Sequence, residues 1–147
     1  LTPVKEIMVP VTDIISVNIN TNLQDILKIF AEHNFTRLPV YQENTDNIVG
    51  IVHLKDIFIL LSQNMNKPLK DLVRIILFVP ESMKINQLLK EFREQHVHMA
   101  MVVNEHGSLI GLITLEDILE EIVGEINDEH ESSVEKIILL KENNWLI

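Results

Sequence analysis

The chain repeats itself at a spacing of 61 or 62 residues, and this duplication limits the folds open to it more than any other feature. Gly50–Ile57 matches Gly111–Ile118 at a shift of 61 residues, and Leu27–Phe30 matches Leu89–Phe92 at a shift of 62. The one-residue difference falls in a loop, where length changes are tolerated. The repeat is longer than a small helical repeat and shorter than an ordinary domain. We therefore expect two similar halves that pack together about a pseudo-two-fold axis.

Apolar periodicity predicts the same order of elements in both halves. Two apolar runs bracket a polar, glycine-bearing turn at residues 104–108, which is typical of a β-hairpin. From Leu115 to Ile126, apolar residues recur at the three- and four-residue spacing of an amphipathic helix. Thr21 with Gln24 fits a capping box at the start of the first helix. The expected strands are 13–19, 35–41, 48–52, 75–79, 96–103 and 109–113. Each half therefore has the order β-α-β-β-α, which predicts an α+β (α/β) fold made of duplicated units.

The repeats also suggest where the domains begin and end. We expect a first domain at residues 1–64, including an N-terminal segment, and a second at 65–126. One helical turn within Leu69–Arg74 is expected to correspond to the turn within Val4–Val9. Residues 127–133 read as an acidic linker. Residues 134–147 read as two strands that stop within an apolar run, as the truncated start of a further domain would.

Composition excludes several classes of function. The chain has 22 acidic and 12 basic residues, a formal net charge of −10, whereas binding to DNA or RNA backbones needs clustered Lys and Arg. It has no cysteine, which excludes disulfides and thiolate metal sites. No apolar run reaches the roughly 18 residues of a membrane span. The carboxylates between Glu116 and Glu131 read mainly as a solvated face, with Glu116 and Glu120 as weak candidate ligands for a divalent cation.

Thr114 and Asp117 are the strongest candidate site residues. Thr114 ends a predicted strand, and Asp117 lies in the first turn of the next helix. A carboxylate there can accept protons from both hydroxyls of a ribose, and free helix N-terminal amides can receive an anion. The same spacing is also that of an ordinary capping box, so both interpretations stay open. In the first repeat His53 replaces the threonine, while Asp56 keeps the carboxylate.

Arg37 is the second candidate, as a lone cation in a largely apolar stretch next to Phe35. Its guanidinium can hold a phosphate with two hydrogen bonds while Phe35 covers a flat base. The alternative is that Arg37 extends outward to pair with a carboxylate.

No arrangement of residues in the sequence supports an enzyme. The six histidines form no His-Glu-x-x-His motif, and there is no Gly-x-Ser-x-Gly motif or glycine-rich phosphate loop. We read the histidines as surface or internally bonded residues and predict no catalytic residues.

Four motifs together resemble a known family. They are Ile7–Pro10, Phe35–Tyr41, Ile48–Asp56 and Leu115–Ile126, of which the last is the longest and most specific. They are similar to the tandem CBS domains, or Bateman module, of the CorC/HlyC and CNNM group of haemolysin-like magnesium and cobalt efflux proteins. The resemblance covers roughly residues 1–130.

The resemblance implies a regulatory module that binds an adenine nucleotide, ATP or AMP, in the cleft between its halves. In this group Mg²⁺ accompanies ATP, and Glu116 or Glu120 is a candidate to bridge it. The positions matching the family's site are Thr114 and Asp117 for ribose, Arg37 for phosphate, Phe35, Ile113 and Ile15 for the base, and Val9 for the wall of the cleft. Because His53 departs from the pattern, we predict one good nucleotide site per chain.

The resemblance also implies partners and a location. CBS pairs dimerise through their helices, so we expect a homodimer. The module is expected in the cytoplasm, attached to a membrane transport domain outside this chain, with residues 134–147 beginning a transporter-associated domain. The alternative function is a structural dimerisation module of the same kind of protein that binds no ligand.

Overall fold

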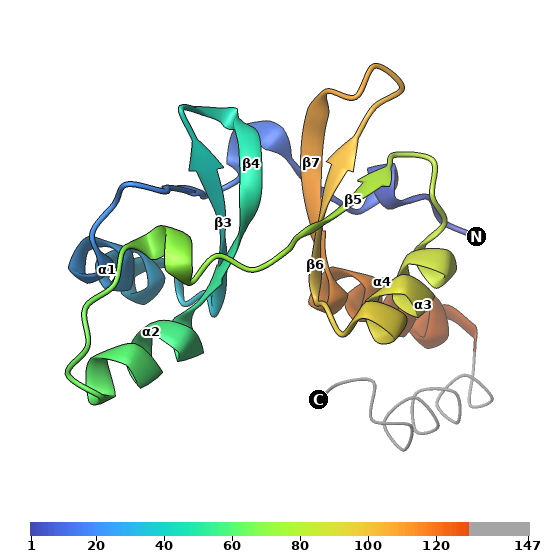
Figure 1. Cartoon of the computed structure of the whole chain (residues 1–147). Coiled ribbons are helices and arrows are strands. Elements are labelled where there is room, and N and C mark those ends of the chain that lie inside the picture. The colour runs from blue at the N-terminus through green and yellow to red at the C-terminus, as the bar shows by residue number, and fades with distance from the viewer. Residues whose placement is uncertain (130–147) are drawn as a thin grey trace. The chain divides into compact units, whose positions relative to one another are not determined.

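The computed structural model describes residues 1–129 of the chain (Figure 1). Its internal contacts divide the chain into two compact units. The first-repeat unit comprises Asp13–Ile76, and the second-repeat unit comprises Leu1–Thr12 together with the chain from Leu77 onward. The strands expected at 134–147, and residues 130–133 of the expected linker, lie outside the described residues.

The first-repeat unit contains a three-stranded sheet of order β2-β3-β4. Strand β2 runs parallel to β3, and β3 forms an antiparallel hairpin with β4. Its elements are β2 (Val17–Asn18), α1 (Leu23–His33), β3 (Arg37–Gln42), β4 (Asn44–His53), α2 (Leu54–Ser62) and the short 3₁₀ turn η3 (Leu69–Asp71), with η2 (Val11–Asp13) at the junction of the two units.

The second-repeat unit contains a four-stranded sheet of order β1-β7-β6-β5. Strand β5 runs parallel to β6, whereas β6 and β1 are both antiparallel to β7. Its elements are η1 (Val4–Glu6), β1 (Val9–Pro10), β5 (Leu77–Pro80), α3 (Ile85–Gln95), β6 (Met99–Val103), β7 (Leu109–Thr114) and α4 (Leu115–Glu129). The β-α-β-β-α order predicted for each repeat and the α+β class are confirmed.

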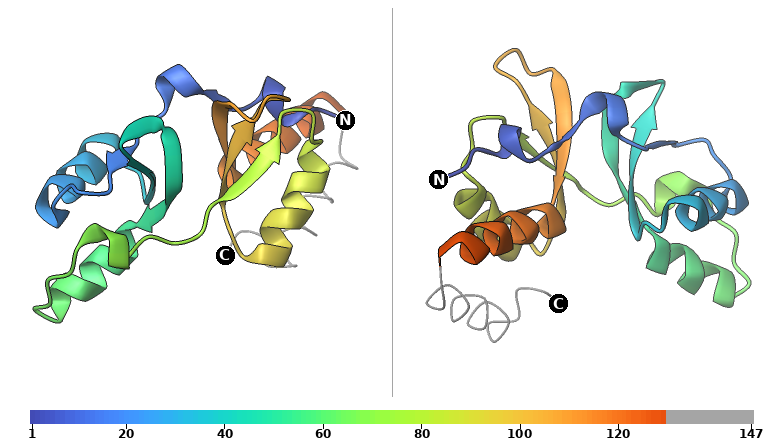
Figure 2. Two further views of the ribbon diagram at one scale, coloured as in Figure 1. Left: turned by 45° about the horizontal axis from the view of Figure 1, so that its top comes forward. Right: turned by 180° about the vertical axis from the view of Figure 1, so that it is seen from behind.

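Each unit has its own hydrophobic core between its sheet and its two helices, which cover one face of that sheet (Figure 2). In the first-repeat unit, Phe30 of α1 and Ile57 of α2 pack with Val52 of β4. In the second-repeat unit, Phe92 of α3 and Ile118 of α4 pack in one cluster with the sheet. Burial of these apolar stripes is what fixes the amphipathic helices on the sheets.

The segment that precedes each repeat packs into the other repeat's unit. Val4 is fully buried in the core of the second-repeat unit, and Leu69 lies at the matching position in the core of the first-repeat unit. A glycine in the receiving strand makes room each time. A Cβ on Gly111 would meet Met8 and the Val9 carbonyl, and one on Gly50 would meet Val73 and the Arg74 carbonyl. The N-terminal segment, grouped with the first repeat in the sequence analysis, thus packs with the second.

Several predicted boundaries were wrong by a few residues. Helix α1 begins at Leu23 and is capped by Asn22, whose side-chain oxygen accepts the Asp25 N–H at 2.9 Å, so Thr21 is not the cap. The strand expected at 13–19 is confined to Val17–Asn18. Helix α4 continues to Glu129, so the first three residues of the expected linker are helical.

Candidate functional site

Thr114 and Asp117 lie where β7 passes directly into α4. The Asp117 N–H donates to Thr114 Oγ1 at 3.1 Å, and the Thr114 N–H donates to Asp117 Oδ2, also at 3.1 Å. This reciprocal pair satisfies two backbone donors at the start of α4. The capping-box interpretation is therefore confirmed as the local structure. It also fixes a hydroxyl and a carboxylate side by side, both half-buried.

The neighbouring candidates Ile113 and Val9 support this corner in different ways. Ile113 is fully buried in the core of the second-repeat unit, so its side chain anchors the end of β7. Val9 is half-buried on β1 and pairs with Leu112 of β7. The N-terminal segment therefore forms the sheet edge next to the strand that carries Thr114.

The weak metal candidates Glu116 and Glu120 are both exposed on α4. Within residues 1–129, no group of three or more His, Asp or Glu side chains is arranged to hold a metal ion.

Arg37 and Phe35 lie at the start of β3 in the first-repeat unit. Arg37 is half-buried and sits opposite His53 in the β3–β4 ladder. Its Nη1 donates to Thr36 Oγ1 at 3.4 Å, a long contact. Phe35 is 43% exposed, and its ring stacks on His33 with centroids 5.6 Å apart and planes 14° from parallel. A solvent-exposed aromatic face thus lies two residues from a cation, the combination expected for a base and a phosphate.

Ile15, the remaining candidate, packs against the core of the first-repeat unit from its partly buried position before β2. The predicted site residues therefore fall on both units. Ile15, Phe35 and Arg37 belong to one unit, and Val9, Ile113, Thr114 and Asp117 to the other.

An ion pair at Asp56 was missed by the sequence analysis. Arg74 donates from Nε to Asp56 Oδ2 and from Nη2 to Asp56 Oδ1, both at 2.7 Å. The hydrogen bond from Arg74, with its positive charge, holds the pKa of the Asp56 carboxyl below its ordinary value. The hydrogen bond to Asp56, with its negative charge, raises the pKa of Arg74 in turn. The match of Leu69–Arg74 to Val4–Val9 gives only the equivalence of Arg74 and Val9, and it is the pairing of Arg74 with Ile51 in the structure that brings it next to Asp56.

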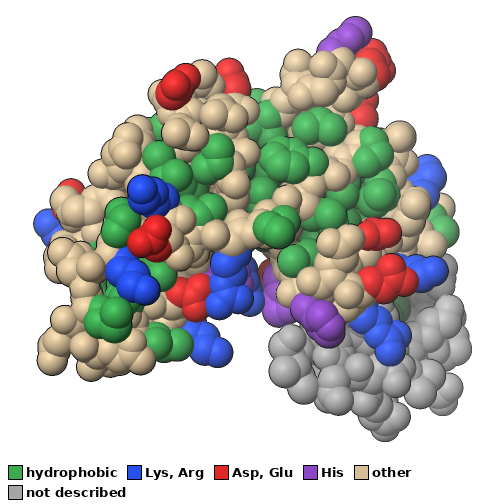
Figure 3. Space-filling view, viewed as in Figure 1, with side chains coloured by type: hydrophobic (Ala, Val, Ile, Leu, Met, Phe, Trp, Pro, Cys, Tyr) green, Lys and Arg blue, Asp and Glu red, His purple; other side chains and the backbone are tan. Residues whose placement is uncertain are grey.

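His96 and His106, two of the described histidines, are exposed and lie in turns. His96 ends α3 in the left-handed region, with φ of 54°, rather than lying in an extended segment with His98. At the tip of the β6–β7 hairpin, where Figure 3 shows histidine beside acidic side chains, His106 Nε2 lies 3.5 Å from Glu105 Oε1. Both of these side chains are exposed, so the contact is a surface pair.

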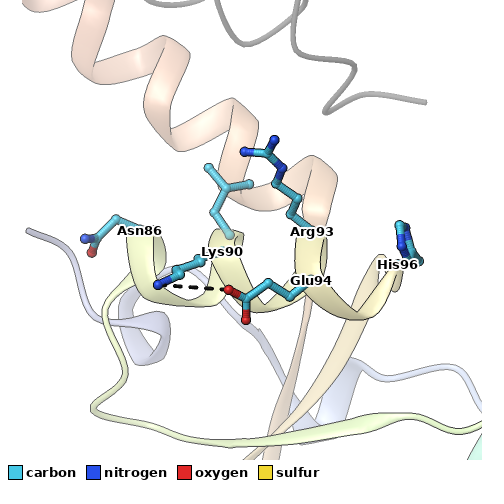
Figure 4. Close-up of a pocket in the computed structure, with 6 residues that line it drawn as sticks. Asn86, Lys90, Arg93, Glu94 and His96 are labelled. Carbon is cyan, nitrogen blue, oxygen red and sulfur yellow. Dashed lines mark ion pairs between the residues drawn. The ribbon is translucent and has the colours of Figure 1, made fainter.

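An open hollow lies along α3 (Figure 4). Lys90 Nζ and Glu94 Oε1 pair across it at 3.9 Å. Its described lining comes from α3 and the residue that ends it, so it brings together no groups from separate elements. These residues are Asn86, Leu89, Lys90, Arg93, Glu94 and His96.

Comparison with known proteins decides the family. The family model described as "CBS domain" matches residues 4–63 and again residues 65–124. The chain belongs to the CBS-domain family. The two matches coincide with the two repeats, so the chain is a tandem CBS pair, as the motifs predicted.

Sequence relatives indicate which group of CBS proteins the chain resembles. The chain is 42% identical to Hemolysin C of Rickettsia prowazekii over 147 residues, which cover 98% of this chain and 48% of that protein. It is 37% identical to Hemolysin C of Brachyspira hyodysenteriae over 144 residues, covering 98% of this chain and 53% of that protein. The CBS pair thus spans about half the length of these curated relatives. Among residues 1–129, no helix is both long and apolar enough to cross a bilayer.

Solved structures agree with this grouping. The CBS domain of a bacterial CNNM/CorC family Mg²⁺ transporter, solved in complex with ATP, matches with a TM-score of 0.76 and 43% identity, covering 85% of this chain and 89% of that one. A CBS-domain pair from Klebsiella pneumoniae with bound AMP matches with a TM-score of 0.72 and 28% identity, covering 84% and 99%. The similarity to the CorC and CNNM group is confirmed.

Proposed function

We propose that this CBS pair is a regulatory module that binds one adenine nucleotide per chain. In this proposal Thr114 and Asp117 hold the ribose and Arg37 holds phosphate. Phe35 and Ile15 contact the base, Val9 lines the site, and Ile113 anchors β7 from the core. The observation that carries it is the fixed hydroxyl and carboxylate at the start of α4, in a chain 43% identical to a CBS domain solved with ATP.

The two repeats carry complementary halves of such a site, which supports the proposal. Arg37 and Met99 occupy matching positions, because each pairs with the last residue of the following strand, His53 and Thr114 respectively. The cation therefore comes from the first repeat, and the threonine from the second. A site that takes its phosphate ligand from the first repeat and its ribose ligands from the second uses Arg37 and Thr114. The opposite choice would use Met99 and His53, and so would have neither the cation nor the threonine.

Mg²⁺ enters this proposal with the nucleotide. The phosphates of ATP bind Mg²⁺ themselves, and Mg²⁺ keeps several waters when a protein supplies only one or two carboxylates. Glu116 and Glu120 are exposed on the same helix as Asp117 and can reach such an ion only as additional ligands. We further propose that the module lies in the cytoplasm, dimerises, and regulates a Mg²⁺ or Co²⁺ transport domain located outside this chain.

The test is isothermal titration of the chain with AMP, ADP and ATP, each with and without Mg²⁺. The key variant is Asp117→Ala, and its matched control is Asp56→Ala, which removes the same group from the same position of the other repeat. Saturable binding that is weakened at least tenfold by Asp117→Ala but not by Asp56→Ala supports the proposal. Absence of binding by all three nucleotides up to millimolar concentration would overturn it.

The rival function is a structural dimerisation module without a ligand. It is favoured by Phe58 and Ile59 on α2, which are large apolar side chains left exposed in a single chain. Both functions predict a dimer, so oligomeric state alone does not separate them. The titration does, because only the nucleotide-binding module responds to Asp117→Ala.

A further inference from the structure

Asp56, the first repeat's equivalent of Asp117, is already hydrogen-bonded to the side chain of Arg74. Asp56 and Asp117 match in the repeat alignment, and both follow the end of a strand by three residues. Both oxygens of the Asp56 carboxylate accept hydrogen bonds from the Arg74 guanidinium at 2.7 Å. A ribose diol would need these same two oxygens, because a carboxylate binds two neighbouring hydroxyls through two acceptors. Arg74 therefore competes with a ribose for both oxygens of the Asp56 carboxylate.

The backbone of Arg74 is fixed, so its side chain is presented to Asp56 by the fold. The Arg74 N–H donates to the Ile51 carbonyl at 2.8 Å, and the Ile51 N–H donates to the Arg74 carbonyl at 2.9 Å. This bridge sits against Gly50, where a side chain would collide with Val73 and Arg74. Five residues upstream, Leu69 is buried in the core of the same unit. The connector between α2 and β5 (residues 63–76) is thus held on the first-repeat unit at Gly50, at Ile51 and in the core.

The second repeat has the same bridge without the guanidinium. Val9 pairs with Leu112 as Arg74 pairs with Ile51, so the two residues are structural equivalents. The side chain of Val9 carries no charge and cannot donate to Asp117, whose Oδ2 accepts the Thr114 N–H at the start of α4. The presence of a guanidinium at Asp56 and its absence at Asp117 therefore follow from one pair of equivalent residues, Arg74 and Val9.

We propose that Arg74 is a built-in occupant that closes the first repeat's carboxylate to nucleotides, and that removing its guanidinium opens a second ribose-binding position at Asp56. The second half of this statement rests on the proposed function, since it assumes that Asp117 binds ribose in the second repeat. The occupant makes the CBS pair a one-nucleotide module even though it has two carboxylates in equivalent places.

The test is the binding stoichiometry of Arg74→Val, which installs the side chain found at Val9. Titrated with AMP and ATP, the unsubstituted chain is expected to bind one nucleotide and the variant two. The new binding is expected to persist in Arg74→Val/Asp117→Ala and to vanish in Arg74→Val/Asp56→Ala. A folded Arg74→Val chain that still binds one nucleotide overturns the proposal, as does new binding that survives Asp56→Ala.

Two further measurements guard against a variant that does not fold. Arg74→Gln keeps most of the side-chain stem and the backbone bridge, and the same outcomes apply to it. In the unsubstituted chain, the NMR signal of the Arg74 Nε–H is expected to stay unchanged at saturating AMP, and a large shift would overturn the proposal by showing that a ligand displaces it.

If the unsubstituted chain binds nothing but Arg74→Val binds through Asp56, the proposed function fails while this inference stands.

Discussion

Asp56 and Asp117 occupy the same position in the two repeats, yet their carboxylates accept hydrogen bonds from different groups. Asp117 Oδ2 accepts the backbone N–H of Thr114, whereas both oxygens of Asp56 accept the guanidinium of Arg74. The divergence follows from two substitutions between the repeats. Histidine replaces threonine at the strand end, and arginine replaces valine on the bridging segment. The carboxylate is thus paired with a cation in the first repeat and bonded to a neutral backbone N–H in the second.

Asp117→Asn separates the charge of Asp117 from its role as a cap. The amide oxygen of asparagine can still accept the Thr114 N–H, so the free energy of unfolding should change by less than about 1 kcal/mol. Loss of a charge-assisted contact should weaken nucleotide binding by roughly 10- to 100-fold. Titration and chemical denaturation measure the two effects, with Asp56→Asn as the control for affinity. Unchanged affinity in a folded Asp117→Asn chain would assign Asp117 to the helix cap alone.

Thr114→Ala should lower the free energy of unfolding by about 1 kcal/mol, because the Asp117 N–H loses its acceptor at the start of α4. Thr114→Ser keeps the hydroxyl and should recover most of this stability. Urea denaturation of the two variants is the measurement. Equal stability of the alanine and serine variants would show that the hydroxyl contributes nothing to the cap.

Gly111→Ala should destabilise the second-repeat unit by about 1–3 kcal/mol through overpacking. The added Cβ would meet Met8 and lie 2.8 Å from the Val9 carbonyl, so β1 must shift away from β7. Gly124→Ala is the matched control, because nothing lies within 4 Å of its Cβ on an exposed helical turn. That change should stabilise α4 by up to about 1 kcal/mol. Thermal melting compares them, and equal melting temperatures would contradict the close packing of β1 on β7.

The Asp56–Arg74 pair should make a small contribution to stability that is lost only in acid. Because the Arg74 hydrogen bond lowers the pKa of Asp56, the folded chain binds this proton less tightly than the unfolded chain. The contribution is therefore fully present above the ordinary aspartate pKa of about 3.9 and disappears as the pH falls through the lowered value. Half of the Arg74 side chain is exposed, so solvent screening limits the effect to about 1 kcal/mol.

Denaturation of the unsubstituted chain and of Arg74→Gln between pH 7 and pH 3 measures this contribution. The difference in unfolding free energy should be constant from pH 7 to about pH 5 and should shrink below about pH 4. A difference that instead grows toward acid pH would contradict the sign of the pKa shift.

Leu69→Ala should destabilise the first-repeat unit by about 2–5 kcal/mol, because a fully packed side chain is removed from its core. Hydrogen exchange locates the effect, which should appear in α1, α2 and β4. Met65→Ala, a change at a partly exposed residue of the same connector, serves as the control. Loss of protection mainly in α3 and α4 would contradict the assignment of Leu69 to this unit.

The sequence was sufficient to predict the order of elements, because both of its signals are local. Alternating and three- to four-residue apolar spacings identified strands and helices. Because the pattern recurs at a shift of 61 residues, an element predicted in one half was supported by its equivalent in the other. Boundaries were wrong where the local signal is ambiguous. Thr21 and Asn22 are both good helix caps, and nothing in Asn127–Glu129 interrupts a helix, so α4 continues through it.

The candidate site was only partly accessible to sequence reasoning, for a physical reason. The hydrogen bonds between Thr114 and Asp117 join residues three positions apart, so spacing alone was enough to predict them. The Arg74–Asp56 pair and the β1–β7 ladder depend on tertiary packing, which brings together residues 18 and about 100 positions apart. A two-residue strand such as β1 has no periodicity of its own by which it could be recognised.

The segment before each repeat packs into the unit of the other repeat, and this sets the order in which the two units can fold during synthesis. Residues 13–76 are contiguous and contain their whole unit, including Leu69, so this unit can form as soon as it leaves the ribosome. Residues 1–12 are synthesised before that unit but must wait for β7 before Val9 has a strand to pair with. Residues 1–12 are therefore ordered later than the unit that follows them in the sequence, and until then their apolar side chains are available to chaperones and proteases.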